Sequence, residues 1–427
     1  MELIAVMEGR AVGALSTDRF GHAQFEYDAS WRNDPGALPV SLSLPLAAKT
    51  HASRTVEAVI WGLLPDNERV LQAWGQRFHV SPRNAIALLS HVGEDCAGAI
   101  QFVRPECVDA VLSGERDDIQ WMADEELAQR LHSLRLDAGA SRRDSDAGQF
   151  SLPGAQPKIA LLRDEGRWGV PSGRIPTTHI LKPPTGNFDG YAHNEHYCLQ
   201  LAAAIGLPTC TSTVLRVGDE VAICVERYDR VKQDGTWLRI HQEDVCQALG
   251  VRPEMKYQNE GGPSPQAIGK LIRDYSTESE GDLQVFFLAL IFNWFIGGSD
   301  AHAKNYSLLL GSNQGVRLAP LYDISSALPY DGIARRKLKL AMKIGSTYKW
   351  HDIRLDDWIE QAATMGFSRE EAFGALRLFV DDLPGIAVAV AGRVDADGMG
   401  HPVVTRLVED IARAAEKCGR MLAVGGR

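Results

Sequence analysis

The sequence predicts an α+β chain in which a strand-rich region with one long helix precedes a mainly helical region. Between residues 150 and 228, short apolar runs alternate with turn residues, which is typical of a twisted sheet. After residues 237–240 the pattern is mostly that of helices. With 427 residues the chain is too long for one ordinary core, and this order of elements is typical of a two-lobed domain.

The composition is that of a globular protein. Hydrophobic residues make up 45% and charged residues 23%, which excludes wholesale disorder. The formal net charge of -10 argues against a chain-wide surface for nucleic acid or anionic membrane. The longest apolar stretch, residues 285–298, is too short to span a membrane. The first residues lack a signal-peptide pattern and the seven cysteines form no C-x-x-C pair, so we expect a cytoplasmic protein with free thiols and no membrane association.

The first part of the chain predicts a compact subdomain followed by a linker. Residues 2–7 predict a strand. One helix is predicted to begin at Pro82 with Ser81 as its N-cap, and another follows Asp124. Residues 137–148 are small and polar and predict a linker. We therefore divide the chain into an N-terminal subdomain, a helix with the linker, a sheet-rich lobe and a helical lobe, at residues 1–110, 111–148, 149–228 and 229–427.

The region after the linker predicts a sheet with one helix. A helix is predicted over residues 194–205, because Gly206 is a typical C-cap. Gly218 and Asp219 predict the turn of a hairpin. The predicted strands are residues 159–163, 168–170, 178–182, 213–217 and 221–225.

The most informative segment is GSDAHAKNYSLLLGSNQGVRLAPLYDI, residues 298–324. Two apolar runs, residues 306–310 and 316–321, flank a turn at residues 312–315 and predict a hairpin. Asn305 precedes the first strand and Asp323 follows the second, so both are expected at the open end of this hairpin. Asp300 lies five residues before Asn305, on a loop after a buried helix.

These three residues have the chemistry of a magnesium-phosphate site. Mg²⁺ prefers hard oxygen ligands and keeps several waters, so an Asn and an Asp suffice beside nucleotide phosphates. The spacing of Asp300 and Asn305 is also that of a protein-kinase catalytic loop, in which the Asp accepts the hydroxyl proton. Ordinary turn and capping chemistry is the alternative explanation for each residue.

Other residues have two explanations each. Lys182 ends a short strand and could hold phosphates as a fixed charge, or could protect a sheet edge. Glu195 could pair with Lys182, or could lie exposed at a helix start. Residues 151–158 form a turn whose amides could cradle phosphates, or an ordinary Pro-Gly turn. Residues 226–228 end a strand and could hold an adenine, or could form a salt-bridge cluster.

Histidines and a basic run are weaker candidates. His193 and His196 could face a metal, but we expect them at the surface or at a helix start. His302 is expected to pack or hydrogen-bond within its loop. A charge run usually forms a solvated face, but here it could also attract an acidic partner or phosphates; its members are Arg335, Arg336, Lys337, Lys339 and Lys343.

Several segments resemble the HipA family, serine/threonine kinases that act as toxins of bacterial toxin–antitoxin modules. The matching text is QFSLPGAQPKIALL, THILKPP, NEHYCLQLAAAIGL, VERYDR, HQEDVCQALG, NWFIGGSDAHAKNYSLLL and APLYDISSALP, with PVSLSLPL and GLLPDN nearer the N-terminus. These blocks follow the family order from about residue 1 to about residue 390. The resemblance implies a two-lobed protein-kinase-like fold, with a β-rich N-lobe, an extra N-terminal subdomain and a helical C-lobe.

The resemblance also assigns roles to individual residues. It implies that Asp300 is the catalytic base and that Asn305 and Asp323 are the ligands of the metal, Mg²⁺. It makes Ser151 a site of inhibitory autophosphorylation, because a phosphate there would repel ATP phosphates. The residues that it assigns to ATP binding are Ser151, Leu152, Pro153, Gly154, Ala155, Gln156, Pro157, Lys182, Glu226, Arg227, Tyr228, His302, Lys304, Asn305 and Asp323.

By the same resemblance, the expected activity is that of a non-specific serine/threonine protein kinase that causes growth arrest and persistence. The expected substrate is a translation protein such as an aminoacyl-tRNA synthetase. The expected partner is a HipB-like helix-turn-helix antitoxin, through which operator DNA is mainly bound. Two alternatives remain: a catalytically weak, antitoxin-bound corepressor scaffold, and a small-molecule kinase.

Overall fold

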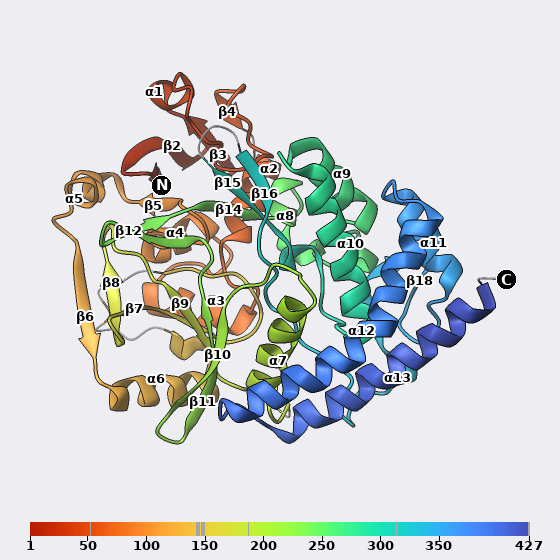
Figure 1. The fold of residues 1–427 in the computed structure, drawn as a ribbon. Helices are drawn as coiled ribbons and strands as arrows, with labels where there is room; N and C mark the ends of the chain where they lie inside the picture. The colour runs from red at the N-terminus through yellow and green to blue at the C-terminus, as the bar shows by residue number, and fades with distance from the viewer. Residues whose placement is uncertain (52, 142–145, 147–149, 187, 312–314, 426–427) are drawn as a thin grey trace. The chain divides into compact units, whose positions relative to one another are not determined.

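The computed structural model describes residues 1–51, 53–141, 146, 150–186, 188–311 and 315–425, and its chain forms two compact units. The first unit contains residues 1–185, 215–254 and 307–316. The second contains residues 186–214, 255–306 and 317–427. Figure 1 shows that the first unit is rich in strands and that the second contains the long helices.

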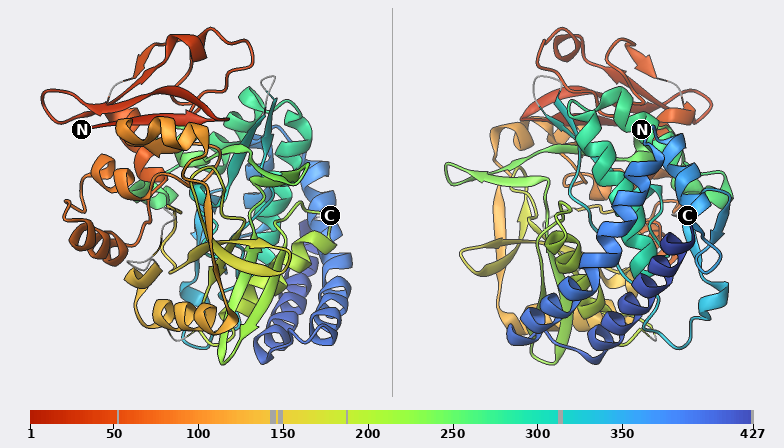
Figure 2. Two further views of the ribbon diagram at one scale, coloured as in Figure 1. Left: turned by 90° about the vertical axis from the view of Figure 1, so that its left-hand side faces the viewer. Right: turned by 45° about the vertical axis from the view of Figure 1, so that its right-hand side comes forward.

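The first unit begins with a five-stranded sheet of order β4-β3-β2-β1-β5, and its first strand is the one that the sequence predicts. Its core is aromatic and aliphatic, with Tyr27, Trp31 and Trp74 almost completely buried. The strands are drawn in red and orange in Figure 2. The elements are β1 (Glu2–Met7), β2 (Arg10–Thr17), β3 (Ala23–Tyr27), β4 (Thr50–His51), β5 (Gln101–Val103), α1 (Ala29–Arg32), α2 (Ser53–Gly62), α3 (Glu68–Phe78), α4 (Ala85–Val92) and α5 (Val108–Ser113).

A six-stranded sheet of order β10-β11-β9-β7-β8-β6 follows. The predicted helix after Asp124 is confirmed as α6 (Asp124–Leu136), whose leucines at helical spacing are buried in the same core as this sheet. The predicted hairpin around Gly218 and Asp219 is confirmed as β10 and β11. The strands are β6 (Asp118–Met122), β7 (Ile159–Asp164), β8 (Arg167–Ser172), β9 (His179–Lys182), β10 (Ser212–Val217) and β11 (Glu220–Glu226).

Two further small sheets connect separate segments of the chain. The antiparallel pair β12 (Arg230–Gln233) and β13 (Thr236–Arg239) forms one. The other has the order β14-β15-β16, from β14 (His241–Asp244), β15 (Ser307–Gly311) and β16 (Gly315–Leu318), and α8 (Val245–Ala248) follows β14. The two strands predicted around residues 312–315 are thus hydrogen-bonded neighbours, whereas residues 312–314 lie outside the described residues.

The second unit consists mainly of helices. Helix α10 is buried along most of its length because its sequence, LQVFFLALIFNWFI, is apolar on every face. Helices α12 and α13 pack side by side (Figure 1). The elements are α7 (Tyr191–Ala204), α9 (Pro265–Tyr275), α10 (Ser279–Ile296), α11 (Leu355–Thr364), α12 (Arg369–Ala396), α13 (Pro402–Gly425) and the antiparallel strands β17 (Lys339–Ile344) and β18 (Thr347–Lys349). In the described part of the chain, no helix is both long and apolar enough to cross a membrane.

Two predicted helix starts are wrong. The helix expected at Pro82 begins at Ala85, because the Asn84 side chain caps it by accepting from the Ala87 N–H, while Ser81 starts a turn. Helix α7 begins at Tyr191, three residues early, because Gly190 adopts a left-handed φ of 70° and serves as its N-cap. Of the predicted linker, residues 142–145, 147 and 148 lie outside the described residues.

Glu243 on β14 joins two segments that lie far apart in the sequence. Its carboxylate accepts from the Ser41 hydroxyl at 2.5 Å and from the Leu42 N–H at 2.7 Å. Ser43 also donates to the Gln247 carbonyl at 2.7 Å. The motifs PVSLSLPL and HQEDVCQALG are therefore bonded to each other within the first unit.

Burial raises the pKa of Glu243 to about 8, against about 4.3 for an exposed glutamate. The folded state therefore holds a proton that the unfolded state releases, and stability falls as pH rises from about 5 to about 8. Glu243→Gln should remove this dependence. As pH rises from about 5 to about 8, the urea midpoint of the wild type should fall relative to that of the variant. Above this range the difference between the two midpoints should stay constant. A pH-independent difference, as for the exposed Glu106→Gln control, would contradict this assignment.

Candidate functional site

The predicted catalytic loop begins where α10 ends. Gly297 adopts a left-handed φ of 65°, and its N–H donates to the Trp294 carbonyl at 3.2 Å. The Gly298 N–H donates to the Asn293 carbonyl at 2.7 Å. Gly297 favours glycine because of its left-handed φ and because a Cβ there would meet the Leu328 side chain at 2.5 Å, and a Cβ at Gly298 would meet Asn293 Oδ1 at 2.3 Å. The chain leaves a rigid helix in one fixed direction.

Asp300 and Asn305 lie in one closed loop. The Asp300 carbonyl accepts from the His302 N–H and from the Asn305 amide, both at 2.8 Å. The Tyr257 hydroxyl donates to Asp300 Oδ1, and its ring packs edge-on against the His302 ring with centroids 5.0 Å apart. Asp300 is exposed, whereas His302, Lys304 and Asn305 are buried. The loop thus presents a carboxylate to solvent from a fixed backbone, and His302 packs as predicted.

Asp323 has an unusual backbone conformation. Among the described residues, five that are not glycine have positive φ, and Asp323, at 56°, differs from the others. Glu8, Glu165 and Asp234 lie in hairpin turns and His79 ends a helix, whereas Asp323 follows no such feature. Aspartate tolerates this conformation better than most residues, at a cost on the order of 1 kcal/mol. Strain of this kind is typical of functional sites.

The chain around Asp323 is held on both sides. Leu321 donates to the Pro208 carbonyl at 2.8 Å and accepts from the Cys210 N–H at 3.0 Å. The Ser326 N–H donates to Asn194 Oδ1 at 2.9 Å, and the Ser326 hydroxyl donates to the carbonyl of Ile296, the last residue of α10.

The catalytic loop and the Asp323 segment touch each other. The Tyr322 hydroxyl donates to the Lys304 carbonyl at 2.7 Å. Asp300, His302, Lys304 and Asn305 therefore lie in one loop of the second unit, with the neighbour of Asp323 bonded to it. Sequence reasoning missed Tyr257, which bonds Asp300 from 43 residues away and has no local signal.

In the first unit, the predicted phosphate loop is bonded to the N-terminal motif GLLPDN. The Ser151 hydroxyl is fully buried and donates to the Leu63 carbonyl at 2.7 Å. The Asp66 N–H donates to the Gly154 carbonyl at 3.1 Å, and the Asn67 amide donates to the Ala155 carbonyl at 2.9 Å. This loop is therefore more than an ordinary Pro-Gly turn, because hydrogen bonds to residues far away in the sequence hold it in place.

Lys182 does not lie at a sheet edge. It ends β9, which lies between β11 and β7, so the edge-protection alternative is wrong. Its side chain is only 6% exposed, and a lysine is rarely buried to this extent without a function or a partner.

The three residues after β11 differ in their environments. Glu226 is exposed, and the Tyr228 hydroxyl donates to Gln242. The Arg227 N–H donates to the Thr178 carbonyl at 2.9 Å, and its side chain enters a buried ionic network. The Arg227 side chain therefore belongs to a salt-bridge cluster, which is the second of the two explanations considered for residues 226–228.

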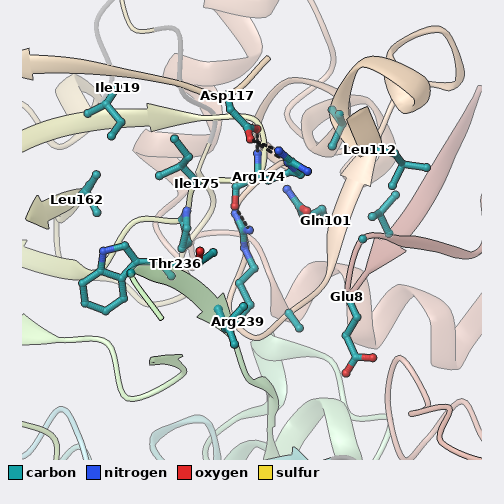
Figure 3. A pocket seen from close by; sticks show the side chains of 18 of the residues that line it. Glu8, Gln101, Leu112, Asp117, Ile119, Leu162, Arg174, Ile175, Thr236 and Arg239 are labelled. Atoms are coloured by element: carbon teal, nitrogen blue, oxygen red, sulfur yellow. Dashed lines mark hydrogen bonds and ion pairs between the residues drawn. The ribbon is translucent and has the colours of Figure 1, made fainter. Parts of the chain in front are cut away.

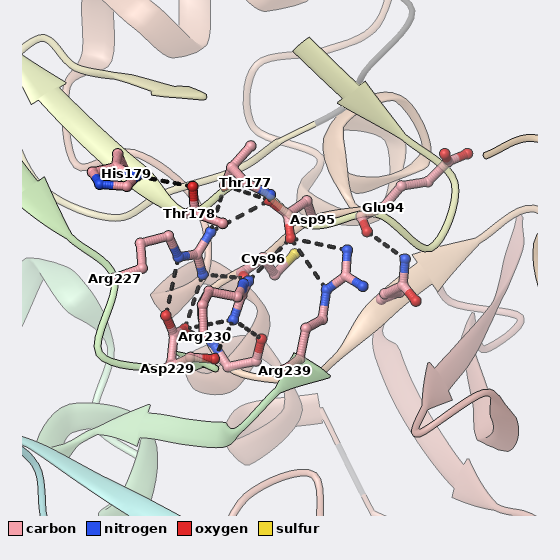
Figure 4. Close-up of polar contacts among 12 residues, drawn as sticks. Glu94, Asp95, Cys96, Thr177, Thr178, His179, Arg227, Asp229, Arg230 and Arg239 are labelled. Atoms are coloured by element: carbon pink, nitrogen blue, oxygen red, sulfur yellow. Dashed lines mark hydrogen bonds and ion pairs between the residues drawn. The ribbon is translucent and has the colours of Figure 1, made fainter. Parts of the chain in front are cut away.

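This network is centred on Asp95 and Asp229, and Figure 4 shows its contacts. Asp95 binds the guanidinium groups of Arg230, Arg239 and Arg227 at 3.0, 3.1 and 3.3 Å, and Asp229 binds Arg227 and Arg230 at 2.9 Å. Burial disfavours the charge of Asp95, but the three arginines outweigh it and lower its pKa to about 2. The Asp95 carbonyl also accepts from the Ser151 N–H at 2.9 Å, so the network supports the phosphate loop.

The expected exposure of side chains on helix α7 is wrong, although His193 lies at the start of the helix as one of the expectations had it. His193, Glu195 and His196 are all buried, at 4%, 0% and 2% exposure. His193 stacks on His401, and His196 lies 3.0 Å from the Ser212 hydroxyl, with burial lowering its pKa to about 4. Among the described residues, no three His, Cys, Asp or Glu side chains gather as a metal site.

The first unit also has a pocket of about 830 Å³ that is not lined by any of the predicted site residues. Its wall is apolar, from residues such as Ile119, Leu162 and Ile175, and its charged groups are largely paired (Figure 3). Arg174 binds Asp117 at 2.7 Å, and Arg239 donates to the Arg174 carbonyl at 2.6 Å.

The comparisons with known proteins identify the family. The HipA-like C-terminal domain matches residues 150–385, which is more than half of the chain, and the HipA N-terminal domain matches residues 3–103. The chain belongs to the HipA family. One relative is Y4mE of Sinorhizobium fredii, whose name describes it as a kinase. It is 36% identical to this chain, and the matched region covers 94% of this chain and 91% of Y4mE. A second relative is the serine/threonine-protein kinase toxin HipA of Shewanella oneidensis. It is 29% identical to this chain, and the matched region covers 79% of this chain and 77% of that protein.

The fold is also that of HipA. A chain of the solved complex of HipA, HipB and operator DNA from Shewanella oneidensis superposes with a TM-score of 0.83. The superposition covers 99% of this chain and 98% of the solved chain, and the two sequences are 24% identical. The predicted α+β, protein-kinase-like fold is therefore confirmed.

The ionic network of this HipA-family protein yields a stability prediction. Asp95→Asn leaves buried arginines without their counter-charge, which costs about 3–5 kcal/mol. We expect the free energy of unfolding in urea to fall by this amount. Asp34→Asn breaks the partly exposed pair with Arg10, which water screens, and should cost far less. Equal losses in the two variants would show that the network does not stabilise the fold.

Proposed function

We propose that this HipA-family protein is an ATP- and Mg²⁺-dependent serine/threonine protein kinase, with Asp300 as the catalytic base. The observation that carries the proposal is the pairing of two segments in the second unit. Asp300 and Asn305 share one closed loop, and Tyr322, beside the strained Asp323, bonds that loop at Lys304. An exposed carboxylate, an amide oxygen and a second carboxylate are the groups that phosphoryl transfer requires.

Asn305 and Asp323 fit the requirements of Mg²⁺. The Asn305 amide nitrogen already donates to the Asp300 carbonyl, so the amide oxygen is the atom available as a ligand. Both proposed ligands are hard oxygen donors, which Mg²⁺ prefers. When bound, the metal would neutralise charge on the β- and γ-phosphate oxygens.

Residues of the first unit would bind the nucleotide. Lys182, buried at the end of a central strand, is the proposed point charge for the phosphates. The loop from Ser151 to Pro157 would supply backbone amides on the phosphate side, and Glu226 to Tyr228 would hold the adenine. Because the Arg227 side chain is engaged in the ionic network, its contribution would come from the backbone. His302 and Lys304 of the second unit are the remaining proposed ATP contacts.

Catalysis by these residues would consist mainly of positioning and charge neutralisation. Tyr257 orients the Asp300 carboxylate through Oδ1. The carboxylate would then accept the proton of the acceptor hydroxyl as the hydroxyl oxygen attacks the γ-phosphorus. The bond between the γ-phosphorus and the β,γ-bridging oxygen breaks, so that ADP leaves and the acceptor keeps the phosphoryl group. The closed loop fixes the distance between this base and Asn305, so no reorganisation of the backbone is needed.

Ser151 is the proposed site of inhibitory autophosphorylation. Its hydroxyl is buried and donates to Leu63, so the loop has to leave this position before Ser151 accepts a phosphate. Afterwards the doubly charged group could not return to a buried site without a counter-charge. Phosphorylation would therefore keep the loop out of its nucleotide-binding position.

The wider role is proposed from the family and its relatives. The solved complex that this fold matches contains HipB and operator DNA as well as HipA. We propose a HipB-like helix-turn-helix antitoxin as partner, with operator DNA bound mainly through it. The proposed substrate is a translation protein such as an aminoacyl-tRNA synthetase, whose phosphorylation would cause growth arrest and persistence in the cytoplasm.

Mass spectrometry after incubation with ATP and Mg²⁺ tests the proposal. Wild-type protein should acquire phosphate on Ser151, and Asp300→Asn should acquire none because the base is lost. Ser151→Ala should lose this phosphate but still phosphorylate a protein substrate. Asp331→Asn, in an exposed loop, is the matched control and should behave as wild type. Full phosphorylation in Asp300→Asn would refute the assignment of the base.

A further inference from the structure

A concentrated basic segment follows Asp323 in the second unit. Between Gly332 and Trp350 the sequence contains six basic residues and no acidic residue, in a chain whose net charge is -10. Arg335 is used structurally, because it binds the buried Asp410 at 2.6 Å and fixes the start of the segment. Lys349 pairs with Asp352 at 3.7 Å. The charge that remains is concentrated on the residues between these two anchors.

We call four of these residues the basic surface: Arg336, Lys337, Lys339 and Lys343. The first three are exposed, and no ion pair involves their side chains among the described residues. Lys343 lies over the Tyr348 ring, with its Nζ 5.3 Å from the ring centroid. In β17, Leu340, Met342 and Ile344 are buried, whereas Lys339 is exposed and Lys343 is half-buried.

The basic surface is connected to the catalytic base by two short steps. The Lys343 N–H donates to the Gln258 side chain at 2.7 Å. Tyr257, the preceding residue, donates its hydroxyl to Asp300. The Ala303 N–H of the proposed catalytic loop donates to the carbonyl of Lys256, the residue before Tyr257. The strand that carries the lysines is therefore fixed to the segment that orients Asp300.

From this arrangement we infer that the basic surface binds acidic residues that flank the acceptor serine or threonine of the protein substrate. The inference rests on the proposed kinase function and adds a substrate class to it. Exposed cations on and just before a strand that is bonded to the segment orienting Asp300 would attract carboxylates near the acceptor and repel basic flanks, and both effects give specificity. A short acidic peptide fits better than a nucleic acid, because the chain's net charge of -10 opposes an extended polyanion.

Binding and turnover of synthetic peptides test the inference separately. The probes are fluorescein-labelled peptides with one central serine, flanked by glutamates, by glutamines or by lysines. Fluorescence anisotropy measures their binding, and phosphate incorporation measures kcat/KM. The triple variant R336E/K337E/K339E is compared with K270E/R377E/R420E, which makes the same change in charge at exposed, locally paired positions.

Wild-type protein and the control variant should prefer the glutamate peptide over the glutamine peptide by roughly tenfold, the sum expected of a few exposed ion pairs. The preference should weaken with salt and reverse towards lysine in R336E/K337E/K339E. ATP-dependent modification of Ser151 should be unchanged in this variant. Equal binding of all three peptides, or an unaltered preference in the variant, would overturn the inference. Variant-sensitive peptide binding without any phosphate transfer would instead overturn the kinase function and leave the surface standing.

Discussion

The C-terminal end of α10 is the constraint on which the candidate site depends. Helix α10 is apolar on every face and buried, so its last turn cannot shift without disturbing the core of the second unit. Both segments of the proposed site are fixed to it. The proposed catalytic loop begins at Gly297, which has a left-handed backbone conformation. The segment after Asp323 is bonded to the same helix end, because the Ser326 hydroxyl donates to the Ile296 carbonyl and the Ala327 N–H donates to the Gly297 carbonyl at 3.1 Å. Asp323 keeps its strained backbone because both neighbours are held.

In the first unit, the N-terminal region has a direct role in building the proposed nucleotide loop. Leu63, Asp66 and Asn67 bond the loop that begins at Ser151, and the Asp95 carbonyl binds its first N–H. The network around Asp95 connects this loop to Arg227, next to the proposed adenine contacts. A disturbance of the N-terminal subdomain would therefore reach the proposed nucleotide-binding residues within the same unit.

Much of the site follows from the sequence where the signal is local. The spacing of Asp300 and Asn305, and two apolar runs before Asp323, were enough to group these residues. The helix leucines after Asp124 and the hairpin around Gly218 were equally local. Contacts between distant segments could not be predicted: Asp95 meets Arg227 across 132 residues, and Tyr257 meets Asp300 across 43. The same limit explains why the burial of His193, Glu195 and His196 is not predicted and why edge protection is an alternative for Lys182, since burial and strand order depend on tertiary packing.

Asp323 is proposed to be held in place to bind a metal-nucleotide complex, and a calorimetric titration of ATP tests this role most directly. Wild-type protein, titrated with and without Mg²⁺, should bind ATP far more tightly when the metal is present. Asp323→Asn should bind weakly and show little response to Mg²⁺, while Asp331→Asn in the neighbouring exposed loop should bind as wild type does. If Asp323→Asn retained the full Mg²⁺-dependent affinity, the site as described here would be wrong.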